Sequence, residues 1–218
     1  MLKQSVMDTV LSFFPKVKIG YKNQSTFMKI IGGLLFFNPL FMKSFITTIG
    51  STIYYPSSAY VDAHPVSSLV VLLHELVHVH DEKKYTEVLF NLLYLMPQLL
   101  AILFIPLLFL VGWKFALLSL LFLAPIPAYF RMYFEKRAYI ASLYVMNKLN
   151  ALHPDYKIDL DDRSNFFVQQ FKNGSYYFMW PFSNLDKEFA GALQLIKNGE
   201  RPYQDDLFDI LDKIIAVS

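Results

Sequence analysis

The chain has 218 residues, of which 55% are hydrophobic and only 17% are charged, and its formal net charge is +2. This length allows one compact domain or a small domain with membrane segments, and the excess of apolar residues favours the second arrangement. The small net charge gives no indication of a nucleic-acid partner. The absence of cysteine excludes disulfides and thiolate-ligated metals, so any metal must be held by imidazole and carboxylate groups.

Residues 1–43 are predicted to form an N-terminal amphipathic or interfacial segment. One helical face near the start of the chain is apolar and consists of Leu2, Val6, Val10 and Phe13. Such a helix either packs on the domain or lies on a membrane surface. The apolar stretch 27–41 is too short for a normal membrane span, so we expect an interfacial or half-buried helix that stops near Pro39.

The next segment, residues 44–149, is predicted to be the functional core, interrupted by a membrane hairpin. Residues 44–49 and 52–55 are rich in β-branched and aromatic side chains and are separated by Gly50-Ser51, which predicts a β-hairpin. The sequence Asp62-Ala63-His64-Pro65 is typical of a helix start. We expect that helix to run from Val66 to about Asp81.

Residues 88–130 are predicted to be a transmembrane helical hairpin. Charged residues are absent from 88–113 and again from 115–130, and only Gly112-Trp113-Lys114 interrupts the apolar run. The first stretch is long enough to cross a bilayer, which takes roughly 20 apolar residues. A buried hairpin of a soluble protein is the alternative interpretation of the same pattern.

Residues 150–218 are polar and are predicted to form a soluble, helical C-terminal region. Helical patterns occur at 165–171, 185–197 and 204–217. An acidic cluster at Asp155, Asp159, Asp161 and Asp162 lacks the glycine and the glutamate of a calcium-binding loop. We interpret this cluster as a solvated face.

The residues that indicate a chemistry are His74-Glu75-Leu76-Val77-His78. Two histidines four residues apart lie on one face of a helix and can bind a single zinc ion. Glu75 is then close enough to act as a general base on a water molecule without being a ligand. Incidental histidines are the alternative, but burying such polar groups in an apolar helix is costly without a metal.

The third metal ligand is predicted to be Glu135. A helical hairpin returns the chain to the side of the membrane that it left, so residues just before and just after 88–130 must be neighbours. Without the hairpin, His78 and Glu135 are joined by a connection of ordinary length. His80 and His64 lie on other faces or other turns of the helix and are not expected to be ligands. A surface position is the alternative for Glu135.

The order of β-hairpin, HExxH helix, membrane hairpin and Glu-x-x-Ala helix resembles the integral-membrane gluzincin peptidases. These include the CAAX prenyl proteases and the bacterial heat-shock membrane protease, and the resemblance covers roughly residues 44–144. It implies that His74, His78 and Glu135 bind zinc and that Glu75 is the general base. Ala138 matches the Glu-x-x-Ala-Asp pattern of these proteins, whereas Tyr139 stands where they have aspartate.

The resemblance also implies a substrate-binding strand. Thr52, Ile53 and Tyr54 resemble the edge strand that pairs with extended substrate in these peptidases, although a purely structural strand is the alternative. From their helical spacing, Arg131 and Tyr139 share a face with Glu135, where they could stabilise an oxyanion or support a ligand. An interfacial anchor is the alternative for Arg131.

We therefore predict a mainly α, α+β protein with a zincin-like helix, acting as a membrane-anchored zinc endopeptidase. Its expected partners are one Zn²⁺ ion, a protein or peptide substrate and the lipid bilayer. The distribution of lysine and arginine around the hairpin predicts that the zinc site and the C-terminus face the cytoplasm. The main alternative is a non-enzymatic membrane or assembly protein with a structural or decayed zinc site, and a soluble peptidase with an apolar lid is a further one. The sequence does not define an oligomeric state.

Overall fold

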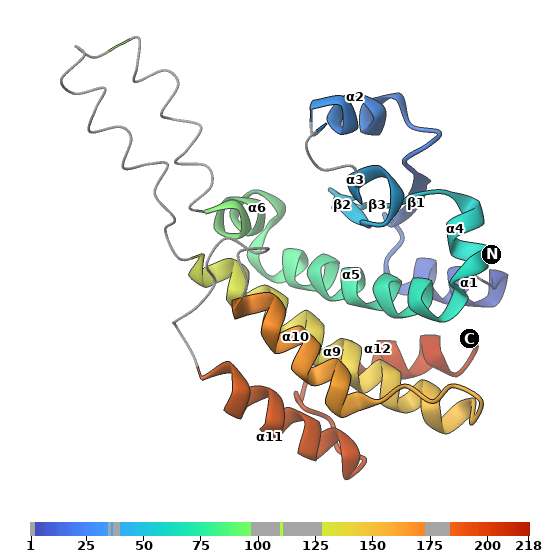
Figure 1. The fold of residues 1–218 in the computed structure, drawn as a ribbon, viewed down its shortest axis with the longest axis vertical. Coiled ribbons are helices and arrows are strands. Elements are labelled where there is room, and N and C mark those ends of the chain that lie inside the picture. Colours follow the sequence, from blue (N-terminus) through green and yellow to red (C-terminus); the bar gives the residue numbers. More distant parts are fainter. Residues whose placement is uncertain (1–2, 35, 37–39, 97–109, 111–127, 173–183) are drawn as a thin grey trace. The chain divides into compact units, whose positions relative to one another are not determined.

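The computed structural model describes residues 3–34, 36, 40–96, 110, 128–172 and 184–218. The described part of the chain is mainly helical with one small sheet, as the sequence predicts (Figure 1). The elements are α1 (Gln4–Phe13), β1 (Lys18–Tyr21), α2 (Thr26–Leu34), α3 (Leu40–Lys43), β2 (Thr47–Ile49), β3 (Thr52–Tyr55), α4 (Ser58–Ala63), α5 (Pro65–Tyr85), α6 (Glu87–Leu95), α9 (Tyr129–Leu152), α10 (Leu160–Lys172), α11 (Leu185–Lys197) and α12 (Asp206–Ile215).

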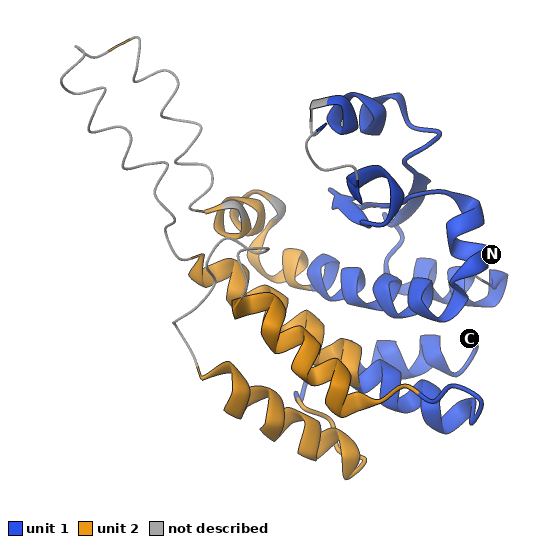
Figure 2. Ribbon diagram, viewed as in Figure 1, with its two compact units in different colours: residues 1–80, 144–157, 203–218 blue, residues 81–143, 158–202 orange. Residues whose placement is uncertain are grey.

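The chain divides into two compact units whose boundaries differ from the predicted ones (Figure 2). Unit 1 comprises residues 1–80, 144–157 and 203–218, and unit 2 comprises residues 81–143 and 158–202. Helices α5 and α9 each continue from one unit into the other. The predicted boundaries at 43/44 and 149/150 followed changes in composition, whereas the units follow packing between distant segments.

Unit 1 brings the two ends of the described chain together. Val6 and Val10 of α1 are buried, in keeping with the apolar face predicted there and with a packed helix. The Lys3 ammonium donates to the Ser218 carbonyl oxygen at 2.9 Å, and the Ser5 hydroxyl donates to the Val217 carbonyl oxygen at 3.0 Å. The N-terminal segment therefore belongs to the same unit as α12, which composition could not indicate.

The sheet has the strand order β1-β3-β2. The predicted hairpin of β2 and β3 is confirmed, and Gly50 in its turn has a φ of 55°, which glycine adopts without strain. Strand β1 was not predicted, and it pairs in parallel with β3. The prediction that Thr52–Tyr54 forms an edge strand is wrong, because β3 has neighbours on both sides. The unpaired edge next to the hairpin belongs to β2 among the described strands.

Helix α5 carries the histidine motif. It begins at Pro65, where the missing N–H is not needed, and ends at Tyr85, a little beyond the predicted end. Asp62 and Ala63 lie instead in the short helix α4, whose N-cap is Ser57. Leu72, Leu73, Leu76 and Val77 are at most 1% exposed, so α5 is buried around much of its circumference.

The predicted membrane hairpin over 88–130 lies mostly outside the described residues. Its described start is α6, and its described end is the first turn of α9. Within the described parts of the chain, no helix combines the length and apolar character needed to cross a bilayer.

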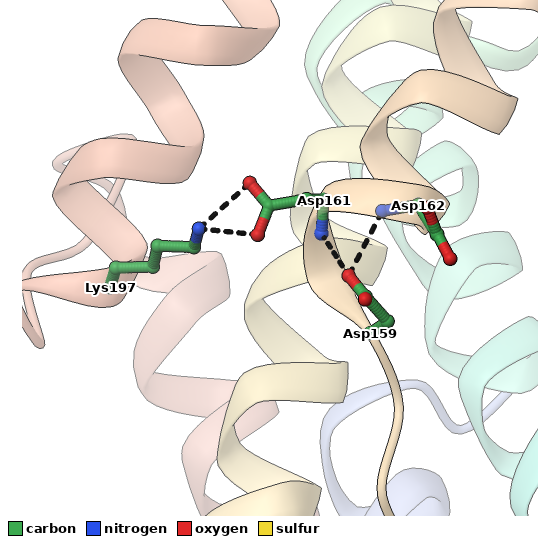
Figure 3. A network of polar contacts seen from close by, with 4 residues as sticks. All are labelled: Asp159, Asp161, Asp162 and Lys197. Carbon is green, nitrogen blue, oxygen red and sulfur yellow. Dashed lines mark hydrogen bonds and ion pairs between the residues drawn. The ribbon is translucent and has the colours of Figure 1, made fainter.

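The C-terminal region contains the three helices that the periodicity predicts, at α10, α11 and α12. The residues of α11 coincide with the predicted range 185–197. In unit 2, an Asp159 carboxylate oxygen accepts from the backbone N–H groups of Asp161 and Asp162 at 2.9 and 3.0 Å and caps α10 (Figure 3). Lys197 of α11 pairs with Asp161 at 2.6 Å. Asp159 therefore caps the N-terminus of α10, and Asp161 joins α10 to α11.

Candidate metal centre

The two motif histidines lie side by side on α5. Their imidazole centroids are 5.1 Å apart and the rings are nearly perpendicular, as expected for residues one helical turn apart. His78 is only 8% exposed, and His74 is half-buried. The surrounding turns of α5 are apolar, so the helix presents two imidazoles in a largely dehydrated environment.

The sheet of unit 1 contacts α5 through two side-chain hydrogen bonds. The Tyr55 hydroxyl donates to the Ser68 carbonyl oxygen at 2.8 Å, and the Thr48 hydroxyl donates to Glu75 Oε2 at 2.7 Å. Thr48 lies opposite Ile53 in the hairpin register, so both side chains lie on the same face of the sheet. Burial raises the pKa of the Tyr55 hydroxyl, and the nearby Glu75 charge adds to this effect. Tyr55 therefore remains a neutral donor.

Glu135 on α9 is buried in unit 2, with 4% of its surface exposed. The Tyr94 hydroxyl of α6 donates to Glu135 Oε1. The Tyr94 ring in turn lies 5.1 Å from the Arg131 guanidinium and stacks with Phe90 at a centroid distance of 5.8 Å. Burying a carboxylate costs free energy unless it is hydrogen-bonded or bound to a cation, and Tyr94 supplies the first of these partners.

A buried ion pair joins α5 and α9 inside unit 2. Arg137 Nη1 donates to Asp81 Oδ1, and Asp81 is 4% exposed. Asp81 lies one turn after His78 on α5, and Arg137 lies two residues after Glu135 on α9. Charge-assisted pairs of this kind have a defined geometry, so this pair fixes the end of α5 against the part of α9 that follows Glu135.

His74, His78 and Glu135 form a group that could hold a metal ion. One ligand atom from each side chain lies within 4.8 Å of the other two. No other group of this kind occurs among the residues that the structure describes. Two imidazoles and one carboxylate form a donor set that suits zinc, and three protein ligands leave further coordination positions for water or substrate. The group agrees with the ligand set predicted from the motif and the chain topology.

The other candidate histidines contact different partners. His80 Nε2 lies 3.2 Å from Asp206 Oδ1 of α12, and the His64 ring lies 4.9 Å from the Tyr60 ring. Neither belongs to the metal group.

The two residues predicted to support the site have different surroundings. The Tyr139 ring packs on Phe167 and Phe171 of α10, at centroid distances of 4.5 and 5.6 Å. These ring contacts hold the Tyr139 side chain against α10. Arg131 lies over the Tyr94 ring, and Tyr94 contacts Glu135, so an aromatic side chain connects Arg131 with Glu135.

Sequence reasoning missed Thr48 and Tyr94. Thr48 lies in a predicted strand and Tyr94 in a predicted membrane segment, and neither belongs to a recognisable motif. The helical topology that placed Glu135 near the end of α5 also brings residues at the start of the hairpin close to it. That signal could have indicated Tyr94, whereas the contact of Thr48 depends on how the sheet packs on α5.

Comparison of the chain with protein-family models, with curated proteins and with solved structures finds no match.

Proposed function

We propose that the protein is a membrane-anchored zinc-dependent endopeptidase. The observation that supports this proposal most directly is the group of His74, His78 and Glu135 on two helices, with Glu75 beside the histidines. The gluzincin peptidases that the sequence resembles use two motif histidines and a distant glutamate as ligands. The same residue types occur here at the corresponding places in the chain.

Zinc is the metal that this donor set fits best. Two imidazoles with one carboxylate, and no thiolate, are typical of catalytic zinc sites with an open coordination position. A bound zinc ion supplies Lewis acidity that polarises a carbonyl oxygen and makes a water molecule more acidic. The side chains of the chain must provide the rest of the chemistry.

Glu75 is assigned the role of general base. Its Oε2 atom accepts the hydrogen bond from Thr48, so we assign the proton transfer to Oε1. Oε1 takes a proton from the attacking water and later returns it to the leaving amine of the peptide. Glu75 is half-buried, which leaves the carboxylate accessible to a substrate. The Thr48 hydrogen bond limits the orientations of the carboxylate before the substrate binds.

We assign the substrate-binding edge to β2. Extended peptides commonly bind by adding a strand to an unpaired sheet edge, where main-chain hydrogen bonds give affinity with broad tolerance for sequence. Strand β2 is adjacent to β3 on one side, and its Thr48 contacts Glu75. A peptide paired with β2 would therefore run beside the general base.

Residues 88–130 are proposed to anchor the chain in the bilayer, with the metal centre on the cytoplasmic side. The positive charges before and after this segment are Lys83, Lys84, Arg131, Lys136 and Arg137, and only Lys114 lies within it. Lysine and arginine in short loops favour the cytoplasm. The cysteine-free chain allows a direct test: a single cysteine at Gly112 should react with an impermeant reagent on intact cells, and one at Glu200 should not. Reaction at Glu200 alone would reverse the orientation.

Metal analysis of wild type beside Glu75→Gln tests the enzymatic proposal. We expect about one zinc ion per chain in both proteins, because Glu75 is not a ligand. Proteolysis of an unfolded protein substrate should fall by roughly 100-fold or more in the variant, as for the loss of a general base. Glu82→Gln, the same change two turns along α5, is the matched control and should keep activity.

The same experiment separates the enzyme from a protein with a structural zinc site. Equal zinc content with no proteolysis in either wild type or variant, across several unfolded substrates, would favour the structural site. Equal proteolysis in wild type and Glu75→Gln would show that another group is the base and would remove the proposal.

A further inference from the structure

The segment from Thr9 to Val61 in unit 1 has an unusual charge composition. It contains five lysines and no aspartate, glutamate or arginine, although the whole chain has a net charge of only +2. Lys22 is buried, whereas Lys16, Lys18, Lys29 and Lys43 are exposed. This part of unit 1 therefore has a positively charged surface.

Apolar side chains lie exposed on the same segment. Helix α2 packs inward through Met28, which is fully buried, and through Gly32, where a Cβ atom would lie 2.7 Å from the Met42 sulfur of α3. Phe27 and Ile30 lie on the outward side of α2 and are 53% and 60% exposed. Phe36, Leu40, Phe45 and Ile49 continue the exposed apolar set through α3 to the end of β2. We call these six residues and the exposed lysines the basic apolar surface.

This combination is unfavourable in water and fits a bilayer interface. Exposed phenylalanine, isoleucine and leucine side chains lower their free energy by entering the boundary between headgroups and acyl chains. Lysines next to them are attracted to anionic headgroups, each by about fivefold in binding. In Figure 1 the sheet lies between α5 and α2, so α2 is on the side of the sheet away from the motif helix.

Other occupants fit this surface less well. A second copy of the chain would bring the same lysines together, and like charges across an interface repel. Single-stranded nucleic acid binds through successive stacking of bases on aromatic rings, whereas three of the six exposed apolar residues are aliphatic. We propose that the basic apolar surface docks unit 1 onto the surface of an anionic lipid bilayer.

The proposal also concerns the substrate, and this part rests on the proposed function. Phe45 precedes β2 and Ile49 is its last residue, and Thr48 of the same strand contacts Glu75. Docking of the surface would therefore keep the β2 edge near the headgroups. The substrates we expect are segments of membrane proteins that emerge from the bilayer at this depth.

The docking test uses the full chain with a single cysteine in place of Ile30, labelled with a fluorophore sensitive to polarity. The protein is reconstituted into vesicles of phosphatidylcholine alone or with 30% phosphatidylglycerol. In the anionic vesicles we expect blue-shifted emission, quenching by shallow spin-labelled lipid and protection from aqueous iodide. Phe27→Cys serves as a second site on the same face of α2.

Leu152→Cys is the matched control, because Leu152 is an apolar residue of unit 1 with the same 53% exposure as Phe27 but lies on α9. Its label should stay accessible to iodide in both vesicles. Lys29→Glu combined with Lys43→Glu should reduce the inserted fraction of the Ile30 label by roughly tenfold or more.

Two outcomes would overturn the docking proposal. One is free access of iodide to labels at both Ile30 and Phe27 in anionic vesicles. The other is equal protection in neutral and anionic vesicles that the double lysine variant does not change, because a different occupant would then cover the surface. Neither readout depends on proteolysis, so failure of the enzymatic proposal would be seen separately.

Discussion

The α5–sheet region of unit 1 and the α6–α9 region of unit 2 each hold one carboxylate of the proposed site, and the surroundings of the two carboxylates differ. Glu75 is half-buried and accepts a hydrogen bond from the Thr48 hydroxyl. Glu135 is 4% exposed and accepts from the phenol of Tyr94. A general base must remain accessible to water and substrate, whereas a metal ligand must be fixed and dehydrated. The surroundings of the two glutamates match these different requirements.

The two regions also differ in how they bury charge. In unit 1, Lys22 is fully buried, and the partners that the described residues offer it are neutral: the Phe41 carbonyl oxygen at 2.7 Å and the Phe41 ring 3.8 Å away. In unit 2, buried Asp81 is paired with Arg137. Opposite charges compensate each other, whereas a lone buried ammonium is destabilised. Burial accordingly lowers the pKa of Lys22 to about 8.

The largest effect is expected from removing the buried carboxylate. Glu135→Ala should weaken zinc binding by more than about 100-fold, because loss of a ligand exceeds the 10–100-fold typical of groups that only support a ligand. Competition with a chromophoric chelator measures this change. His80→Ala, which removes a histidine outside the metal group, is the control and should leave zinc affinity unchanged. Loss of zinc affinity in His80→Ala but not in Glu135→Ala would assign the third ligand to His80.

The second prediction concerns the buried ammonium of Lys22. Between pH 8 and 10 the unfolded chain keeps the Lys22 proton and the folded chain releases it, so the free energy of unfolding should rise with pH, by about 2 kcal/mol. Above pH 10 the gain should reverse, since burial raises the pKa of Tyr55 and only the unfolded chain ionises there. Denaturant unfolding at a series of pH values measures the change.

Lys22→Met provides the control for this pH dependence. Methionine has a similar length and no titrating group, so the rise between pH 8 and 10 should disappear. A rise of the same size in the variant would assign the effect to another group.

Tyr94→Phe tests whether the surroundings of Glu135 orient it as a metal ligand. The change removes only the hydroxyl that donates to Glu135 and should lower zinc affinity by 10–100-fold, as for other groups that orient a ligand. At saturating zinc, most of the activity should return. Unchanged zinc affinity would mean that the hydrogen bond does not orient Glu135 toward the metal.

Thr48→Val should have the smallest effect, and it concerns the Glu75 carboxylate. The substitution keeps the shape of the side chain but removes the hydrogen bond to Glu75, so kcat should fall by roughly tenfold. Zinc affinity and KM should stay near their wild-type values, and Thr48→Ser should restore kcat. A rise in KM with unchanged kcat would show instead that Thr48 acts on the bound peptide.

Much of the candidate site follows from the sequence. The spacing of His74 and His78 defines a shared helical face, because the α-helix repeats every 3.6 residues. The long apolar segment then predicts that residues on either side of it are neighbours, and this reasoning selected Glu135. The amphipathic helices α1, α11 and α12 were recognised for the same reason, since local periodicity determines their buried faces.

The tertiary structure decided the features that depend on long-range pairing. Strand β1 joins β3 in parallel and makes it the central strand, which no local pattern of residues 52–55 could reveal. The contacts of Thr48 with Glu75 and of Tyr94 with Glu135 join residues 27 and 41 positions apart. Sequence periodicity specifies which side of an element is buried, but not which element covers it. Packing of the complete chain determines that choice, and with it the partners of both carboxylates.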